Sequence, residues 1–320
     1  MPKKIITAML AFAALTCLAA AAHAQAPVTF AAGNGDDSHD CLTPNTACRN
    51  IFAAHDKTAA GGVIHALAGS YGGIIITKAI EIIADQGNST IANTGFSDNN
   101  NQSAAINIKA GAGDIVRIRG ITVDQMNGGS LVGISLNSGA ALELENIAIV
   151  NAPGGGLHVI PNVGAAASIV VKDSFFGYNL AGNVLIAPKA GVVVNAVFDR
   201  VTTPSGAFGI KADNSDSGKI RADVRDSVAN DNANNGYIAV GNGANPVHFM
   251  IERSTASGNG AYGAVASGAQ AFMIATYSTL IGNATGLAQL AGSTVASTGT
   301  NTINFNTANK SGTITPIGLQ

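Results

Sequence analysis

The feature that most constrains this chain is an internal repeat of 24–27 residues. Anchor positions mark the repeat at steps of 26, 27, 27, 26, 27 and 24 residues: Ile121, Ile147, Ser174, Val201, Ser227, Ser254 and Ser278. The residues three and five positions before every anchor are apolar, and so are most of those two positions after it. A unit this short cannot bury its apolar face alone, so the repeat predicts a solenoid of stacked units.

Apolar residues at a period of two indicate strands with one buried face. The phase changes at each anchor, so we expect a corner there and a second strand after it. A polar residue follows four or five positions later, and we expect these side chains to form a ladder inside a bend: Gln125, Asn151, Asn179, Ser205, Asn232, Asn259 and Asn283. A glycine then opens a third strand, as at Gly133, Gly156, Gly209 and Gly236. Three short strands per turn predict an all-β fold, a right-handed parallel β-helix.

Charged residues stand at the outward positions, and their sign alternates from one repeat to the next. Two positions before the anchors lie Arg119, Glu145, Lys172, Asp199, Arg225 and Glu252. One position before them lie Asp173, Arg200, Asp226 and Arg253. Stacked strands are about 4.8 Å apart, so alternating charges attract and like charges would repel. We expect two structural ladders that fix the register between coils, which makes these residues poor candidates for catalysis.

Residues 1–24 have the pattern of a signal peptide. Lys3 and Lys4 precede an apolar run, and Ala22-His23-Ala24 forms a cleavage site. We expect a secreted protein of Gram-negative bacterial type, located in the periplasm or the medium. Two cysteines remain, Cys41 and Cys48, and in an oxidising compartment the expectation is a disulfide. The alternative, a metal site, would need two further ligands at suitable spacing, and we find none in the sequence.

The ends of the solenoid need covering, because open strand edges invite aggregation. We expect residues 25–62 to form a disulfide loop and a capping helix, and residues 63–320 to form the solenoid. Thr46 or Asn50 would cap the helix, and Gly61-Gly62 would end it. The segment from about Thr294 to Gln320 is rich in Thr and Asn, and we expect irregular strands there.

Several phrases of the chain are specific enough to compare with known families. They are Phe30-Ala-Ala-Gly-Asn-Gly-Asp-Asp, Cys41…Cys48-Arg, Thr58-Ala-Ala-Gly-Gly-Val-Ile, Ile76-Thr-Lys-Ala-Ile-Glu-Ile, Gly113-Asp-Ile-Val-Arg-Ile-Arg-Gly and Phe208-Gly-Ile-Lys-Ala-Asp. Together they resemble a largely uncharacterised family of bacterial secreted right-handed parallel β-helix proteins, pectate-lyase-like in architecture. The resemblance implies the fold, whereas kinship of fold alone does not establish a reaction.

The composition argues against several classes of function. The net charge is −2, and no basic run follows the signal peptide, so we expect no nucleic acid partner and no membrane insertion after signal removal. The three-aspartate pattern of polygalacturonases and the Gly-x-Ser-x-Gly, His-Glu-x-x-His and phosphate-loop motifs are absent from the sequence. Asp36, Asp37 and Asp40 are interpreted as a solvated turn rather than a calcium site.

One group of residues merits testing as a site. In the third strands the outward residues should include Ser135, His158, Lys211 and Tyr237, with His158 and Lys211 two coils and about 10 Å apart. The loop after Lys211 adds Asp213 and Asp216, and Arg221 follows shortly. His158, Lys211 and Asp213 are the catalytic candidates, and Lys211, Tyr237, Asp216 and Arg221 are the substrate-binding candidates. The alternative interpretation is that they are ordinary solvent-facing residues, as we expect for His248.

Two hypotheses follow. The first is a non-catalytic, monomeric β-helix protein of the cell surface or envelope that interacts with polysaccharide and needs no cofactor or metal. The second is a lyase, glycoside hydrolase or epimerase acting on an acidic polysaccharide along the solenoid groove, and only this hypothesis would involve Ca²⁺.

Overall fold

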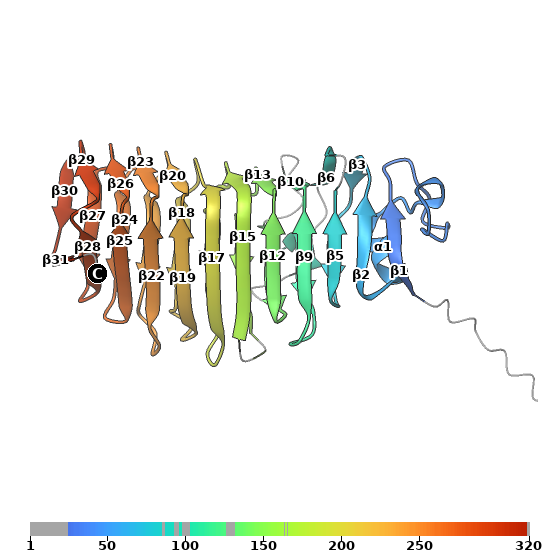
Figure 1. The fold of residues 1–320 in the computed structure, drawn as a ribbon, viewed down its shortest axis with the longest axis horizontal. Coiled ribbons are helices and arrows are strands. Elements are labelled where there is room, and N and C mark those ends of the chain that lie inside the picture. Colours follow the sequence, from blue (N-terminus) through green and yellow to red (C-terminus); the bar gives the residue numbers. More distant parts are fainter. Residues whose placement is uncertain are drawn as a thin grey trace, which may run out of the picture.

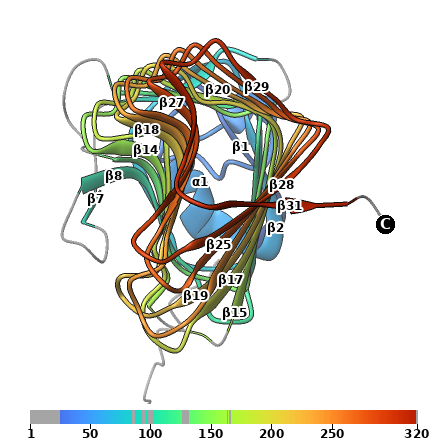
Figure 2. The same ribbon diagram turned by 90° about the vertical axis from the view of Figure 1, so that its left-hand side faces the viewer.

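The computed structural model describes residues 25–84, 87–92, 96–97, 103–125, 132–162, 164 and 166–318; the expected signal peptide lies outside these residues. The chain winds into a parallel β-helix, as predicted. Figure 1 shows the strands as successive rungs along the long axis, and Figure 2 looks along that axis onto the stacked coils. Three faces run the length of the solenoid, and the strands between its two ends pair with strands of the coils before and after them.

The first face holds the long strands: β1 (Ala26–Ala31), β2 (Thr58–Ala66), β5 (Ile80–Ile83), β9 (Ile115–Arg119), β12 (Ala141–Glu145), β15 (Ala166–Gly177), β17 (Val193–Thr202), β19 (Lys219–Arg225), β22 (Val247–Glu252), β25 (Ala271–Thr276), β28 (Thr294–Thr298) and β31 (Ile314–Ile317). The second face is narrow: β3 (Gly69–Tyr71), β6 (Ser89–Ala92), β10 (Ile121–Asp124), β13 (Ala148–Val150), the ends of β15 and β17, β20 (Val228–Asn230), β23 (Thr255–Ser257), β26 (Thr279–Ile281) and β29 (Thr302–Asn304).

The third face is a separate sheet: β4 (Ile74–Ile76), β8 (Ser103–Lys109), β11 (Val132–Ser138), β14 (Gly155–Val159), β16 (Val184–Ile186), β18 (Phe208–Asp213), β21 (Asn235–Val240), β24 (Tyr262–Ser267), β27 (Thr285–Leu290) and β30 (Ala308–Ser311). The short strand β7 (Phe96–Ser97) pairs with β8 in the antiparallel sense. The other pairings between named strands of the described chain are parallel, which is the arrangement that a β-helix requires.

The core is built from the columns of apolar residues that the repeat predicts. All the residues three and five positions before the anchors are buried, from Val116 and Ile118 in β9 to Met273 and Ala275 in β25. The phase change at each anchor is also confirmed. The residue just before it has a positive φ, as at Asp173 (49°), Arg200 (55°) and Asp226 (51°), and this left-handed conformation turns the chain between the first and second faces.

Buried amides form the predicted ladder at the second bend. Asn259 Nδ2 donates to Asn283 Oδ1 (2.9 Å), and Asn232 Nδ2 donates to Asn259 Oδ1 (2.9 Å). Asn179 joins the ladder through Asn183, whose Nδ2 donates to Asn232 Oδ1. Two expected members, Asn151 and Ser205, lie one residue earlier in the bend with positive φ. The prediction was wrong there because these coils have Ala152 and Gly206 at the ladder position, and their backbone N–H groups donate to the amides of the next coils.

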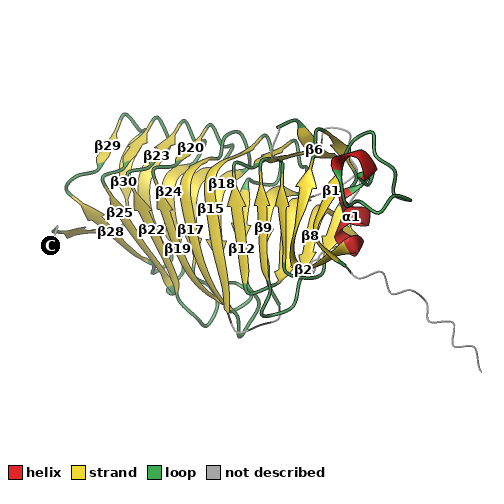
Figure 3. Cartoon of the chain, turned by 45° about the vertical axis from the view of Figure 1, so that its right-hand side comes forward, coloured by secondary structure: helices red, strands yellow, loops and turns green. Residues whose placement is uncertain are grey.

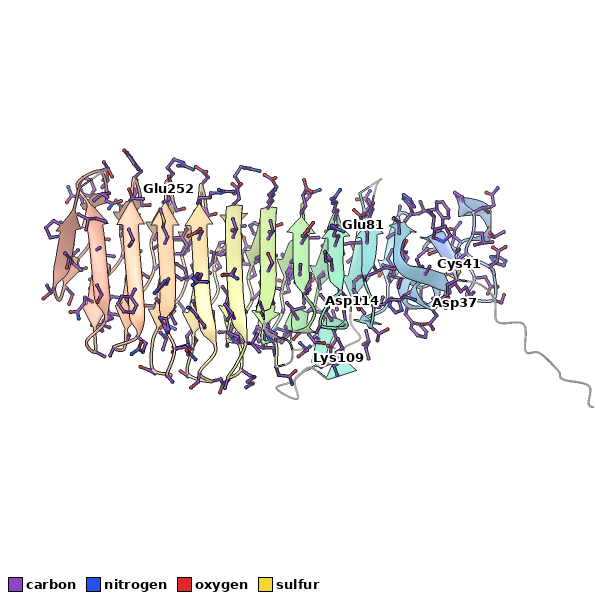
Figure 4. All side chains as sticks on the ribbon, turned by 60° about the horizontal axis from the view of Figure 1, so that its bottom comes forward. Asp37, Cys41, Glu81, Lys109, Asp114 and Glu252 are labelled. Atoms are coloured by element: carbon purple, nitrogen blue, oxygen red, sulfur yellow. A yellow bond between two sulfur atoms is a disulfide. The ribbon has the colours of Figure 1, made fainter. Side chains whose placement is uncertain are left out.

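The two charge ladders are confirmed. Strand register places Arg225 between Asp199 and Glu252, and Arg225 Nη2 lies 3.3 Å from Asp199 Oδ2. In the neighbouring column Arg200 pairs with Asp173 (2.6 Å). The columns stand at one corner of the solenoid, where Figure 4 labels Glu252. These charges are therefore occupied in holding adjacent coils in register.

The front end is closed by a disulfide loop and a helix, both of which were predicted. Cys41 and Cys48 form the disulfide, and helix α1 (Ile51–Lys57) buries Ile51, Ala53, Ala54 and His55 against the first coils. A 3₁₀ turn, η1 (Pro44–Thr46), precedes α1. The helix ends at Lys57, not at Gly61-Gly62: Thr58 already begins β2, in which these glycines form part of the strand. Figure 3 shows α1 at this end of the solenoid.

The rear end is more regular than expected. Residues 294–317 supply β28, β29, β30 and β31, which continue all three faces. The expectation of irregular strands was wrong because the side chains are polar but the backbone still pairs in register. Ile303 and Ile314 remain packed against the core.

Candidate functional site

The densest charge group predicted from the sequence is present but is internally neutralised. Lys211 Nζ lies 2.8 Å from Asp213 Oδ2 at the end of β18, and the Lys211 ammonium also lies 5.9 Å from the centre of the Phe208 ring. Burial alone would raise the pKa of Asp213. The hydrogen bonds from Lys211 and Ser215 outweigh that effect and hold the pKa below its usual value. Asp213 is thus an ionised, paired carboxylate.

His158 occupies the predicted column but is not solvent-facing. It lies in register with Ser135 on one side and with Leu185, then Lys211, on the other. Its side chain is buried, and Ser135 is fully buried beside it. The imidazole packs closely against Gly155: a Cβ added to that glycine would lie only 2.5 Å from His158 Nε2. The expectation that His158 and Ser135 are exposed on this face is therefore wrong.

Tyr237 faces the core rather than the solvent. Its partner in the preceding coil is Ile210, a core residue, so Tyr237 is fully buried and Ile238 takes the outward position next to Lys211. The phenol donates a hydrogen bond to the Thr255 carbonyl (3.2 Å), and burial raises its pKa. A ligand on the surface has no access to this ring.

The two remaining predicted residues do not join Lys211. Asp216 pairs with Lys189 across coils (2.7 Å). Arg221 lies on β19 of the first face, whereas Lys211 lies on β18 of the third face. The predicted group is therefore divided between two sheets, although its members are close in sequence.

A shallow groove on the outer surface of the first face was missed in the grouping from sequence. Strands β19, β22 and β25 line it with Arg221, Asp223, His248, Met250, Phe272 and Ile274. Phe272 is 38% exposed and Ile274 is 40% exposed, and their outward positions are unusual for such residues in a strand. A volume of about 400 Å³ lies above them.

The register explains how these side chains come together. Arg221, His248 and Phe272 are direct partners on three successive strands, and Asp223, Met250 and Ile274 form the parallel row two residues on. The rings of His248 and Phe272 are 5.4 Å apart and nearly perpendicular. Arg221 Nη1 donates to Asn195 Oδ1 of the preceding coil (3.4 Å). The groove thus combines an exposed aromatic ring, a guanidinium, an imidazole and a carboxylate. The signal that could have found it is an aromatic residue at an outward strand position.

The described residues also bear on two other kinds of site. Among them, no group of three or more His, Cys, Asp or Glu side chains could hold a metal ion. In the same part of the chain, no helix is long and apolar enough to cross a membrane. The disulfide of the front loop is a bond typical of proteins outside the cytoplasm.

Three solved structures are similar to this chain. The A-module of mannuronan C-5 epimerase AlgE6 from Azotobacter vinelandii is 14% identical and has a TM-score of 0.56, with 78% of this chain and 74% of that chain covered. The A-module of mannuronan C-5 epimerase AlgE4 from the same organism is 13% identical, with a TM-score of 0.47 and coverage of 81% and 87%. A rhamnogalacturonan lyase is 12% identical, with a TM-score of 0.36 and 83% of each chain covered.

No protein-family model matches the chain, and no curated protein matches its sequence. The likeness to the AlgE6 module confirms the resemblance to parallel β-helix proteins that the sequence phrases suggested. At this level of identity the likeness describes the fold.

Proposed function

We propose that this protein is exported and binds an acidic polysaccharide, without turnover, in the groove over β19, β22 and β25. The observation that carries the proposal is the row of Arg221, His248 and Phe272 on adjacent strands. Exposed aromatic rings are platforms for the apolar faces of sugars, and a guanidinium binds carboxylates through paired hydrogen bonds. Asp223 in the second row can accept hydrogen bonds from sugar hydroxyls.

The absence of turnover is supported by the state of the residues predicted to be catalytic. Lys211 and Asp213 neutralise each other, and His158 is buried beneath the surface of the third face. A general base has to reach the proton that it removes, and a buried imidazole cannot approach a polymer on the surface. The charged residues of the ladders are engaged between coils. Within the described chain this leaves the groove as the best-equipped surface for a sugar polymer.

The proposal is tested by calorimetric titration with polymannuronate, polygalacturonate and a neutral glucan. We expect saturable binding of at least one polyuronate and none of the neutral polymer. Phe272→Ala should weaken binding about 3–10-fold, since aromatic contacts contribute about 0.5–1.5 kcal/mol. Phe305→Ala is the matched control, because Phe305 is 82% exposed but lies outside the groove. Equal affinities of the two variants would exclude the groove as the binding site.

A second candidate function, a lyase or epimerase of uronic acid polymers, is favoured by one feature of the same groove. His248 and Arg221 are register partners, so an imidazole could take the proton next to a uronate carboxylate while the guanidinium neutralises that carboxylate. The name of the Azotobacter module, an epimerase of mannuronan, makes polymannuronate a sensible substrate to include. The test is the appearance of unsaturated ends or epimerised residues, with and without Ca²⁺, and their loss in His248→Gln.

A further inference from the structure

The two ends of the solenoid are finished in different ways. At the front, α1 lies over the first coils and buries Ile51 and Ala54 against them. At the rear, the last strands on the three faces are β29, β30 and β31, and each pairs with only one earlier strand, β26, β27 or β28. No helix follows them in the described chain. Unpaired backbone groups along such an edge are a template for a strand of another molecule.

The core also reaches this open end. Ile303 and Ile314 are only partly buried and continue the apolar columns of Leu280 and Val295. A second copy of the chain, placed tail to tail, could cover these side chains and pair with the unpaired strands. Head-to-tail stacking is blocked because α1 occupies the front. The tail-to-tail contact would therefore give a closed dimer and no longer assembly.

One residue of the last coil breaks the apolar pattern. Lys310 is the register partner of Leu287, which continues the fully buried column of Ile210, Tyr237 and Ala264. It thus stands at a core-facing position of β30, the last strand of the third face in the described chain, and its side chain is exposed there. A stacked second molecule would bury its ammonium, which is costly without a partner. In β31, Pro316 has no N–H to offer to a new strand.

We propose that Lys310 and Pro316 keep the rear edge from associating with a second copy of this chain. A charge at an inward position and a proline on an edge strand are the means by which β-sheets avoid edge-to-edge pairing. In the described part of the chain no helix covers this end, and these two side chains would protect it instead. This inference is independent of the proposed function, because the groove lies on the outer surface of the first face.

The test is the molar mass in solution, measured by sedimentation of the full mature protein and its variants. The protein concentration runs from about 1 to about 100 μM, the range in which weak dimers form. We expect a monomer for the wild type and for Lys310→Arg, and a dimer for Lys310→Leu with Pro316→Val. Growth should end at the dimer. A cysteine introduced at Thr315 should cross-link the dimer, whereas one introduced at the front, at Ser38, should not.

Three results would overturn the proposal. One is a folded Lys310→Leu/Pro316→Val variant that stays monomeric at about 100 μM, the highest concentration tested. Another is a wild-type protein that already dimerises through its rear end. The third is a dimer of the variant that cross-links through Ser38 rather than Thr315. Circular dichroism confirms that each variant is folded, and Lys310→Leu alone serves as the test if the double variant fails to fold.

Discussion

The amide ladder allows a sharp test of how the coils are held together. Asn259 is 1% exposed, and its side chain makes contacts in both directions along the axis. Its Oδ1 accepts from Asn232 N (3.1 Å) and Asn232 Nδ2 (2.9 Å), and its Nδ2 donates to the carbonyl of Ala229 (3.0 Å) and to Asn283 Oδ1 (2.9 Å). Asn259→Ala removes all four hydrogen bonds at once.

The expected cost follows from the groups that lose their partners. The N–H of Asn232 loses its acceptor and the carbonyl of Ala229 loses this donor, while Asn232 Nδ2 still reaches the Thr203 carbonyl. Each buried group left unsatisfied costs about 1–3 kcal/mol, so we expect the free energy of unfolding to fall by about 2–6 kcal/mol. Asn259→Asp should cost at least as much, because its second carboxylate oxygen would face the Ala229 carbonyl and Asn283 Oδ1, which are both acceptors.

The assay is equilibrium denaturation in guanidinium chloride, followed by circular dichroism. Asn230→Ala is the matched control, since Asn230 lies on the same coil as Asn232 but is only half-buried, and its side chain bonds to neighbouring Asp231. We expect that control to shift the midpoint little. If Asn259→Ala were as mild as Asn230→Ala, the ladder would not be what holds these coils together.

Three further perturbations address the other contacts. Arg225→Glu places a like charge between Asp199 and Glu252, so it should lower the free energy of unfolding by about 1 kcal/mol more than Arg225→Gln. This difference should shrink in about 1 M salt, where the screening length is about 3 Å. Equal effects of the two variants at low salt would refute the ladder. Lys211→Ala should cost about 1–2 kcal/mol at neutral pH and more than Lys189→Ala, whose pair with Asp216 is more exposed. Because the pKa of Asp213 is lowered in the folded state, its contribution is present above the unfolded-state pKa and is lost as the pH falls through the folded-state value. Urea titrations from neutral to acid pH should therefore show the free energies of unfolding of the wild type and Lys211→Ala converging. A difference that stays constant with pH would contradict the pairing of Lys211 with Asp213. Cys41→Ser with Cys48→Ser should lower stability by about 2–3 kcal/mol and loosen the front coils first, which hydrogen exchange would detect as faster exchange near α1; uniform loosening along the chain would count against a local role.

The fold could be predicted because the same pattern of residues recurs in successive coils. Each coil places apolar residues at the same inward positions and alternating charges at the same outward ones, so an error in one coil is corrected by the others. The bends needed more than periodicity. Asn151 and Ser205 have the expected polarity but supply the positive φ of the turn, while backbone N–H groups of the next residues meet the ladder.

The candidate site was predicted less well, for identifiable reasons. Tyr237 was predicted at an outward position of its strand, but it is aligned with the core residue Ile210, and Ile238 is the residue aligned with Lys211. The Thr255 carbonyl satisfies the phenol inside. His158 is at the expected outward position, but whether a position is covered depends on neighbouring segments, which alternation does not report. Lys211 and Arg221 are close in sequence and lie on different sheets, because a corner of the coil separates them.

The residues of the groove are recognisable in the sequence only once the strand register of all the coils is known. His248 was expected on a strand surface, and its exposure is confirmed. Phe272 and Ile274 stand at outward positions of β25, and the strand pairing aligns them with His248 and Met250. An outward aromatic residue beside a histidine could have been identified by extending the outward columns of the early coils to the rear of the chain.

The measurement that tests the central claim most directly is incubation of the purified mature protein with a panel of polyuronates, with and without Ca²⁺. Binding is followed by titration, and the recovered polymer is examined for unsaturated ends, new reducing ends and altered sugar composition. We predict saturable binding that depends on Phe272 and Arg221, with the polymer recovered unchanged. Conversion of the polymer, abolished in His248→Gln, would contradict binding without turnover and make the groove an active site. Absence of binding by folded protein across the panel would contradict the polysaccharide proposal itself.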